Sequence, residues 1–93
     1  MNVCFVSGKV VEEVEFKFYI GSRKSSVAKT KIKLENGSSI EIKGYDEMAD
    51  WIYQNVLEND RVCIQGKLDN KMQVEVEYIK DLGCTNVLSH TIW

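Results

Sequence analysis

The chain of 93 residues contains no proline and a single histidine, His90. Its three cysteines, Cys4, Cys63 and Cys84, form no Cys-x-x-Cys pair and are odd in number. Neither a zinc site nor a disulfide framework is therefore indicated. Because no second catalytic group is spaced around the lone histidine, we expect no enzymatic activity and no cofactor.

Long apolar runs are also missing from the sequence. The apolar start, Val3 to Val6, is interrupted by Ser7-Gly8-Lys9, and no basic leader precedes it. We therefore expect neither a signal peptide nor a membrane span. The expected setting is the cytoplasm, with reduced cysteines and no membrane partner.

Composition predicts one globular domain with an uneven distribution of charge. Hydrophobic residues make up 44% of the chain and charged residues 28%, which suffices for a single modest core. The net charge of −2 by itself argues against nucleic-acid binding. However, the segment Phe16 to Tyr45 carries +5 and the remainder −7, so one surface can have a positive field of its own.

The clearest pattern in the chain is a predicted β-hairpin. Segments Ala28–Leu34 and Ile40–Tyr45 alternate between apolar and polar side chains, and Asn36-Gly37 between them favours a tight turn. The polar side carries Lys29, Lys31, Lys33, Glu41, Lys43 and Tyr45. A basic sheet face that ends in an aromatic residue suits phosphates and stacked bases. The alternative is that these lysines only solvate an ordinary sheet surface.

Alternation predicts further strands, over Asn2–Val11, Val14–Ile20, Val62–Leu68 and Met72–Tyr78. The first is apolar on both faces, with Val3 and Phe5 on one and Cys4, Val6 and Val10 on the other. We therefore expect a second layer or a second subunit over its outer face. Gly8 in this strand is expected to mark a bulge or a sharp coil. A helix of about three turns should follow the hairpin, with the side chain of Asp46 as its N-cap.

Two groups of polar residues are expected to flank the hairpin. Lys17 and Tyr19 share the polar face of the second predicted segment, beside the hairpin if the two pair. Arg23 and Lys24 lie in the polar loop that follows, where they would form a mobile clamp over a ligand. A solvated turn is the alternative interpretation of this loop.

The order of these elements predicts an all-β fold, the five-stranded OB-fold barrel with one helix between strands 3 and 4. In this assignment the first strand is long and has a central bulge, the hairpin supplies the second and third strands, and two strands follow the helix. The binding face of an OB-fold is centred on its second and third strands. Those are the strands that carry the lysines here.

At this point the chain resembles the bacterial single-stranded-DNA-binding protein family over residues 2–82. The matching residues are Asn2-Val3, Phe5, Ser7-Gly8-Lys9-Val10, Gly21, Val27-Ala28, Ile42 to Tyr45, Met48-Ala49, Val62, Ile64, Gly66-Lys67-Leu68, Val74-Glu75-Val76 and Leu82. The resemblance implies an OB-fold domain over residues 1–82 that binds single strands with little sequence preference, in replication and repair. It also implies assembly into dimers or tetramers through the first strand, and a base-stacking role for Tyr45.

The sequence departs from this family in its loops and its tail. The family's long loops are reduced here to residues 35–38 and 69–71, and its stacking tryptophan at the start of the third strand is matched by Ser39. The C-terminal tail, residues 83–93, lacks the acidic, glycine-rich composition through which the family recruits partners. A reduced relative of the phage, plasmid or primosome type is therefore expected.

The leading hypothesis is a module that binds single-stranded DNA, with RNA left open. In it, Lys17, Lys29, Lys31, Lys33 and Lys43 contact phosphates, Tyr45 and Tyr19 stack on bases, and Arg23 and Lys24 form the clamp. The alternative is an OB-fold subunit for protein interaction or assembly, with little or no DNA binding. Short loops, few aromatics and net acidity favour the alternative, and pairing of the lysines with acids such as Glu41 would strengthen it.

Overall fold

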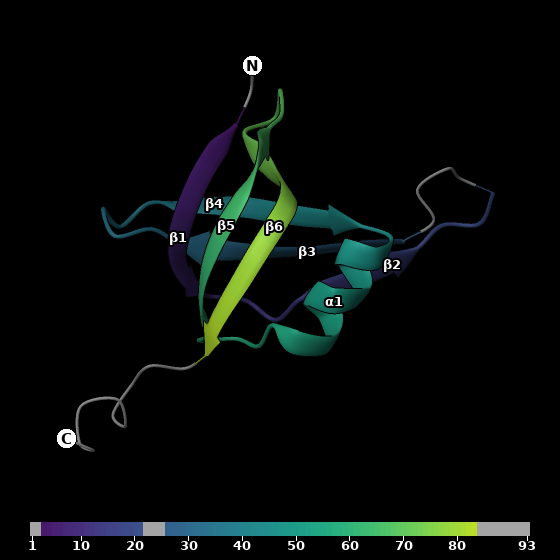
Figure 1. Ribbon diagram of the computed structural model, residues 1–93, viewed down its shortest axis with the longest axis horizontal. Coiled ribbons are helices and arrows are strands. Elements are labelled where there is room, and N and C mark those ends of the chain that lie inside the picture. The colour runs from purple at the N-terminus through teal and green to yellow at the C-terminus, as the bar shows by residue number, and fades with distance from the viewer. Residues whose placement is uncertain (1–2, 22–25, 84–93) are drawn as a thin grey trace.

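The computed structural model describes residues 3–21 and 26–83 of the chain (Figure 1). Its elements are, in order, β1 (Cys4–Val10), β2 (Glu15–Phe18), β3 (Ser26–Lys33), β4 (Ser39–Tyr45), α1 (Glu47–Asn55), β5 (Arg61–Leu68) and β6 (Gln73–Gly83). The predicted tail lies outside the described residues apart from Gly83, which ends β6, and so do Arg23 and Lys24. No helix in the described ranges is long and apolar enough to cross a bilayer.

The six strands form one mixed sheet that closes into a barrel. Their order is β1-β5-β6-β4-β3-β2, and the sheet closes where the end of β1 pairs with β3 at Lys9↔Lys33 and Val10↔Ile32. The strands β1 and β2 lie within the predicted segments Asn2–Val11 and Val14–Ile20: β1 pairs with β5, and β2 pairs with β3. The predicted OB-fold barrel, with its helix after the hairpin, is therefore confirmed.

The core lies between two crossing layers of the barrel. Strands β3 and β4 run behind and across β1, β5 and β6, and α1 covers one end of the barrel (Figure 1). Buried aliphatic side chains from both layers meet there, including Val10, Ile32, Ile42 and Val62, none of which is more than 1% exposed. The helix contributes Ala49 and Ile52 to the same cluster.

The helix begins differently from the prediction. Asp46 has φ 53° and makes no side-chain hydrogen bond to the first turn. Its carboxylate instead accepts a hydrogen bond from the Ser26 backbone N–H at 3.4 Å, and its own backbone N–H donates to the Ser26 carbonyl at 3.0 Å. The predicted N-cap role of the Asp46 side chain is therefore wrong, because that side chain fastens the end of β4 to the start of β3.

Gly8 has a structural role other than a bulge. The pairing of β1 with β5 runs without a shift from Cys4 to Lys9, so the bulge expected at Gly8 is absent. A Cβ atom on Gly8 would overlap the carbonyl oxygen of Lys33 on β3. Glycine is required because the two backbones approach this closely where the barrel closes.

Candidate nucleic-acid interface

The predicted lysines lie together on the outer face of β3 and β4, which we call the lysine face. Its members are Lys29, Lys31, Lys33, Lys43 and Tyr45. The strand register sets Lys31 opposite Glu41 and Lys33 opposite Ser39. It sets Lys29 between Lys43 of β4 and Glu15 of β2. Directly opposed side chains have their Cβ atoms about 4.5–5.5 Å apart, so the hairpin brings these groups into one surface.

Two of the predicted phosphate ligands, Lys31 and Lys17, form exposed ion pairs with carboxylates. The Nζ atom of Lys31 lies 3.8 Å from an oxygen of Glu12, and that of Lys17 lies 3.8 Å from an oxygen of Glu15. All four side chains are at least 39% exposed. Exposed ion pairs contribute about 0–1 kcal/mol, so phosphates can replace these carboxylates at small cost.

Lys43 is held much more firmly than the other lysines. Its Nζ atom donates to Asp69 at 2.6 Å and to Gln73 at 3.1 Å, and its side chain is only 16% exposed. The hydrogen bond to Asp69 raises the pKa of Lys43 and lowers the pKa of Asp69 to about 2. Lys43 therefore ties β4 to the turn between β5 and β6, and its predicted phosphate contact would require breaking this link.

The two predicted stacking tyrosines occupy different positions. Tyr45 is half-buried on the lysine face, in one row with Val27 and Lys17, and its ring centroid is 6.0 Å from the Nζ atom of Lys43. Tyr19 follows the end of β2 and is 46% exposed, outside the paired part of the sheet. The structure thus brings Tyr45, but not Tyr19, onto the lysine face.

Lys29 and Lys33 are the cations of the lysine face that have no ion pair with a described residue. The prediction omitted Lys9, an exposed side chain at the end of β1 that is the direct register partner of Lys33. Only the closure of the barrel reveals this neighbour, because Lys9 and Lys33 are far apart in the sequence and each looks like an ordinary strand lysine. Among the described residues, no cluster of histidine, cysteine, aspartate and glutamate could hold a metal ion.

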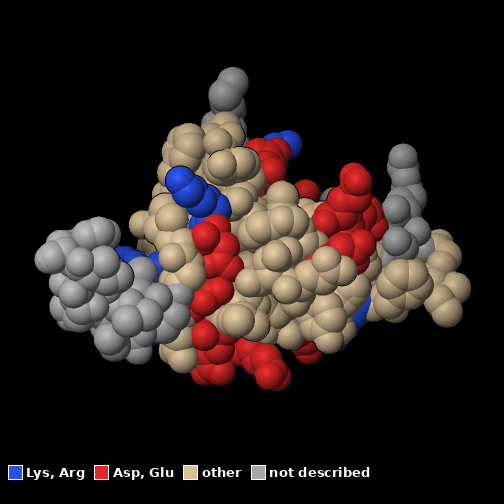
Figure 2. All heavy atoms as spheres, turned by 60° about the horizontal axis from the view of Figure 1, so that its bottom comes forward, with Lys and Arg blue, Asp and Glu red and all other residues tan. Residues whose placement is uncertain are grey.

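Acidic residues partly offset the positive charge of the lysine face and dominate another face. Glu41 lies between the lysines and accepts a hydrogen bond from the amide of Gln73. Figure 2 shows acidic side chains gathered on the side of the barrel that lies at the bottom of Figure 1, near α1 and the end of β6. The helix contributes Glu47 and Asp50 and carries no basic residue in its last turn.

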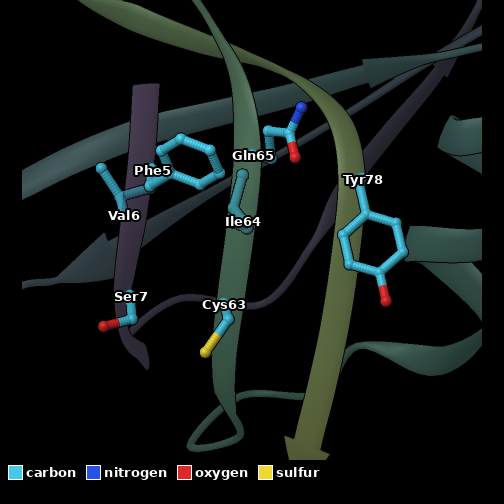
Figure 3. A pocket seen from close by; sticks show the side chains of 7 residues that line it. All are labelled: Phe5, Val6, Ser7, Cys63, Ile64, Gln65 and Tyr78. Atoms are coloured by element: carbon cyan, nitrogen blue, oxygen red, sulfur yellow. The ribbon is translucent and has the colours of Figure 1, made fainter. Parts of the chain in front are cut away.

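A second surface feature is an apolar groove on the outer face of β1, β5 and β6 (Figure 3). It has a volume of about 330 Å³ and includes Phe5, Cys63, Gln65 and Tyr78 in its lining. Phe5 is 74% exposed and Tyr78 is 59% exposed, and Gln65 lies between them in the strand register. The outward apolar side of the first strand, predicted from the alternation, is therefore exposed in the single chain.

The fold and the surface together define a small OB-fold barrel with a cation-bearing face on β3 and β4, which correspond to the second and third strands of an OB-fold. Solved structures share this fold. One is the SSB domain of a Synechococcus protein, with 20% sequence identity and a TM-score of 0.74 over 85% of this chain and 93% of that one. Another is the mitochondrial single-stranded DNA binding protein Rim1 from S. cerevisiae, with 14% identity and a TM-score of 0.74 over 88% of this chain and 94% of that one.

The single-stranded DNA binding protein from Thermus aquaticus has a TM-score of 0.76 at 14% identity. That match covers 96% of this chain and 44% of the Thermus chain. At such identities the likeness establishes the fold. No model of a known family matches the sequence, and no curated protein matches it either.

The Lys43–Asp69 link predicts a specific acid sensitivity. The pKa of Asp69 is about 2 in the folded protein and near 3.8 without the link, so the ionised carboxylate stabilises the fold above pH 3.8. This stabilisation is lost as the pH falls towards 2. Urea denaturation across this window should show that the Asp69→Asn variant loses less unfolding free energy on acidification than the parent.

The control for this experiment is Asp50→Asn, which removes an exposed carboxylate on α1. It should lose stability in parallel with the parent. Burial raises the pKa of Asp81, so this group stabilises the folded state as the pH falls. Because all three proteins contain Asp81, its contribution does not affect their comparison. Parallel pH curves for the parent and Asp69→Asn would contradict the assignment of the link.

Proposed function

We propose that this protein binds single-stranded DNA on the lysine face, by contacts to phosphates and bases and without strong sequence preference. The observation that carries the proposal is the position of Lys29 and Lys33. They lie on the face of an OB-fold that is suited to nucleic acid. Neither lysine forms an ion pair within 4 Å of a described carboxylate, although Lys29 lies opposite Glu15 of β2, which is paired with Lys17. The solved structures that share this fold and are named as single-stranded DNA binding proteins support the same function.

The chemistry of this face is electrostatic with a small stacking component. Each lysine that contacts a phosphate releases a bound counterion, which makes the binding salt-dependent. Tyr45 would add base stacking worth about 1–3 kcal/mol, and a single such aromatic predicts weaker binding than a platform of several. In this proposal the protein has a binding role, not a catalytic one, and acts in the cytoplasm during replication or repair.

Acidic residues on and beside the lysine face weaken its attraction for phosphates. Lys31 lies near Glu12 and opposite Glu41, so its net contribution to the attraction of a phosphate is smaller than that of Lys33, whose register partners are Ser39 and Lys9. Lys29 lies opposite Glu15, which is paired with Lys17. Lys43 already neutralises Asp69. A protein-interaction role is the less supported function, because Lys29 and Lys33 form no ion pair within 4 Å of a described carboxylate and are available to phosphates.

We also propose that the protein forms a homo-oligomer through β1. From Cys4 to Gly8 this strand pairs with β5 along one edge, and its other edge pairs with no described strand. An open edge is a ready template for the same strand of a second copy, in a two-fold arrangement. The ring of Phe5 on the outer face would then contact side chains of the second subunit's paired strand.

DNA binding can be tested with fluorescence anisotropy of labelled oligo-dT, roughly 30 nucleotides long so that it exceeds the site of one OB-fold. The parent should bind saturably, and affinity should fall as salt rises. The Lys29→Gln variant should bind more weakly, with its log–log salt slope reduced in magnitude by about 0.7. Lys71→Gln, which removes the same charge from the turn between β5 and β6, is the control and should match the parent. No binding of the parent at low salt would sink the proposal.

Self-association can be tested by sedimentation velocity of the parent and of Phe5→Lys. The parent should sediment as a dimer or tetramer, and the variant as a monomer, because a charge would have to be buried in the interface. Leu57→Lys, at a position that is 66% exposed next to the helix, should behave like the parent. A monomeric parent, or a Phe5→Lys variant that still associates, would overturn assembly through β1.

A further inference from the structure

Three cations form one row across three strands at the closure of the barrel. The register places Lys33 of β3 opposite Lys9 of β1, and Lys9 opposite Arg61 of β5. Lys33 and Lys9 are exposed, and Arg61 is half-buried. Opposed residues on neighbouring strands share one face of a sheet, so the three side chains lie side by side on the outside of the barrel.

This row has no compensating acid among the described residues. Lys17, Lys31, Lys43 and Lys67 each lie within 4 Å of a carboxylate, whereas Lys33, Lys9 and Arg61 have no ion pair with a described residue. Asp60, next to Arg61 in the sequence, is 6% exposed, and its carboxylate accepts a hydrogen bond from the Leu57 backbone N–H at 3.0 Å. Like charges directly opposite each other destabilise a sheet, so the row lowers the stability of the protein when no anion is bound.

The row is continuous with the lysine face. Lys33 belongs to both, since it also pairs with Ser39 on β4. From Lys33 the row leads away from the hairpin, over β1, to the start of β5. A chain of phosphates that leaves the lysine face at Lys33 would therefore meet Lys9 and then Arg61, whose planar guanidinium can bind a phosphate through two hydrogen bonds.

We propose that Lys33, Lys9 and Arg61 form a phosphate track, which guides the single strand from the lysine face around the closure of the barrel to β5. This inference rests on the proposed function and extends it, because it adds two residues and a direction to the binding path. The bound phosphates also remove the repulsion within the row. Nucleic acid is favoured over an acidic protein because the track continues a face that presents Tyr45 for base stacking.

The test compares the double variant Lys9→Gln/Arg61→Gln with Lys67→Gln/Lys71→Gln, a control that removes the same charge from β5 and the following turn. Each protein is titrated with oligo-dT of about 5 and about 15 nucleotides, the range of sites on one OB-fold, at several salt concentrations. On the longer strand the track variant should show a log–log salt slope smaller in magnitude than the parent's by about 1.4. Over a tenfold rise in salt, the factor by which its affinity falls should therefore be about 25 times smaller than the factor for the parent. On the shorter strand, which the lysine face accommodates, the difference should shrink.

The outcomes distinguish failure of the phosphate track alone from failure of the proposed function. If the parent binds oligo-dT and the track variant matches the control, the track is refuted while the proposed function stands. If the parent binds no oligo-dT at low salt, both fail. If the parent binds polyglutamate as tightly as oligo-dT, the row is a site for an acidic polypeptide and the inference is wrong.

Folding of the variants provides a second, independent readout. Without DNA, the melting temperature of the track variant, measured by circular dichroism, should equal or exceed that of the parent, because repulsion within the row is relieved. A melting temperature below that of the Lys67→Gln/Lys71→Gln control would show that the three cations serve the fold instead, and would contradict the inference.

Discussion

The close crossing of β1 over β3 is the constraint on which the rest of the molecule depends. It turns an open sheet into a barrel, and it requires a residue without a side chain at position 8, against the backbone of Lys33. Closure also encloses the core, since Val10 and Ile32 are paired at this crossing and are fully buried. Without this pairing, the layer of β3 and β4 would be joined to the layer of β1, β5 and β6 along one side only, where β4 pairs with β6 (Figure 1).

The same crossing determines how the surface charges are arranged. It joins the basic outer side of β3 to the end of β1, and so continues the lysine face into the phosphate track formed by Lys33, Lys9 and Arg61. Acidic side chains gather on a different side, near α1 and the end of β6 (Figure 2). A protein with a negative net charge can in this way present a positive path to an anionic strand.

Local patterns were enough to predict most of the fold. The hairpin and its basic face follow from alternation and one Asn-Gly turn, which act over neighbouring residues. Contacts between segments that are far apart in the sequence could not be predicted from these local patterns. The link from Lys43 to Asp69 spans 26 residues, and the row from Lys33 through Lys9 to Arg61 exists only in the closed barrel. The Asp46 side chain was assigned to the helix for the same reason, because its partner Ser26 lies 20 residues away.

One continuous binding path over β3, β1 and β5 can be mapped directly by nuclear magnetic resonance. In a titration of ¹⁵N-labelled protein with unlabelled oligo-dT at low salt, the amide signals that shift most should belong to β3, to the end of β1 and to the start of β5. Signals of α1 should move least. Shifts confined to α1 and the acidic side of the barrel, or no shifts at all, would contradict the central claim that single-stranded DNA binds the basic face of the barrel.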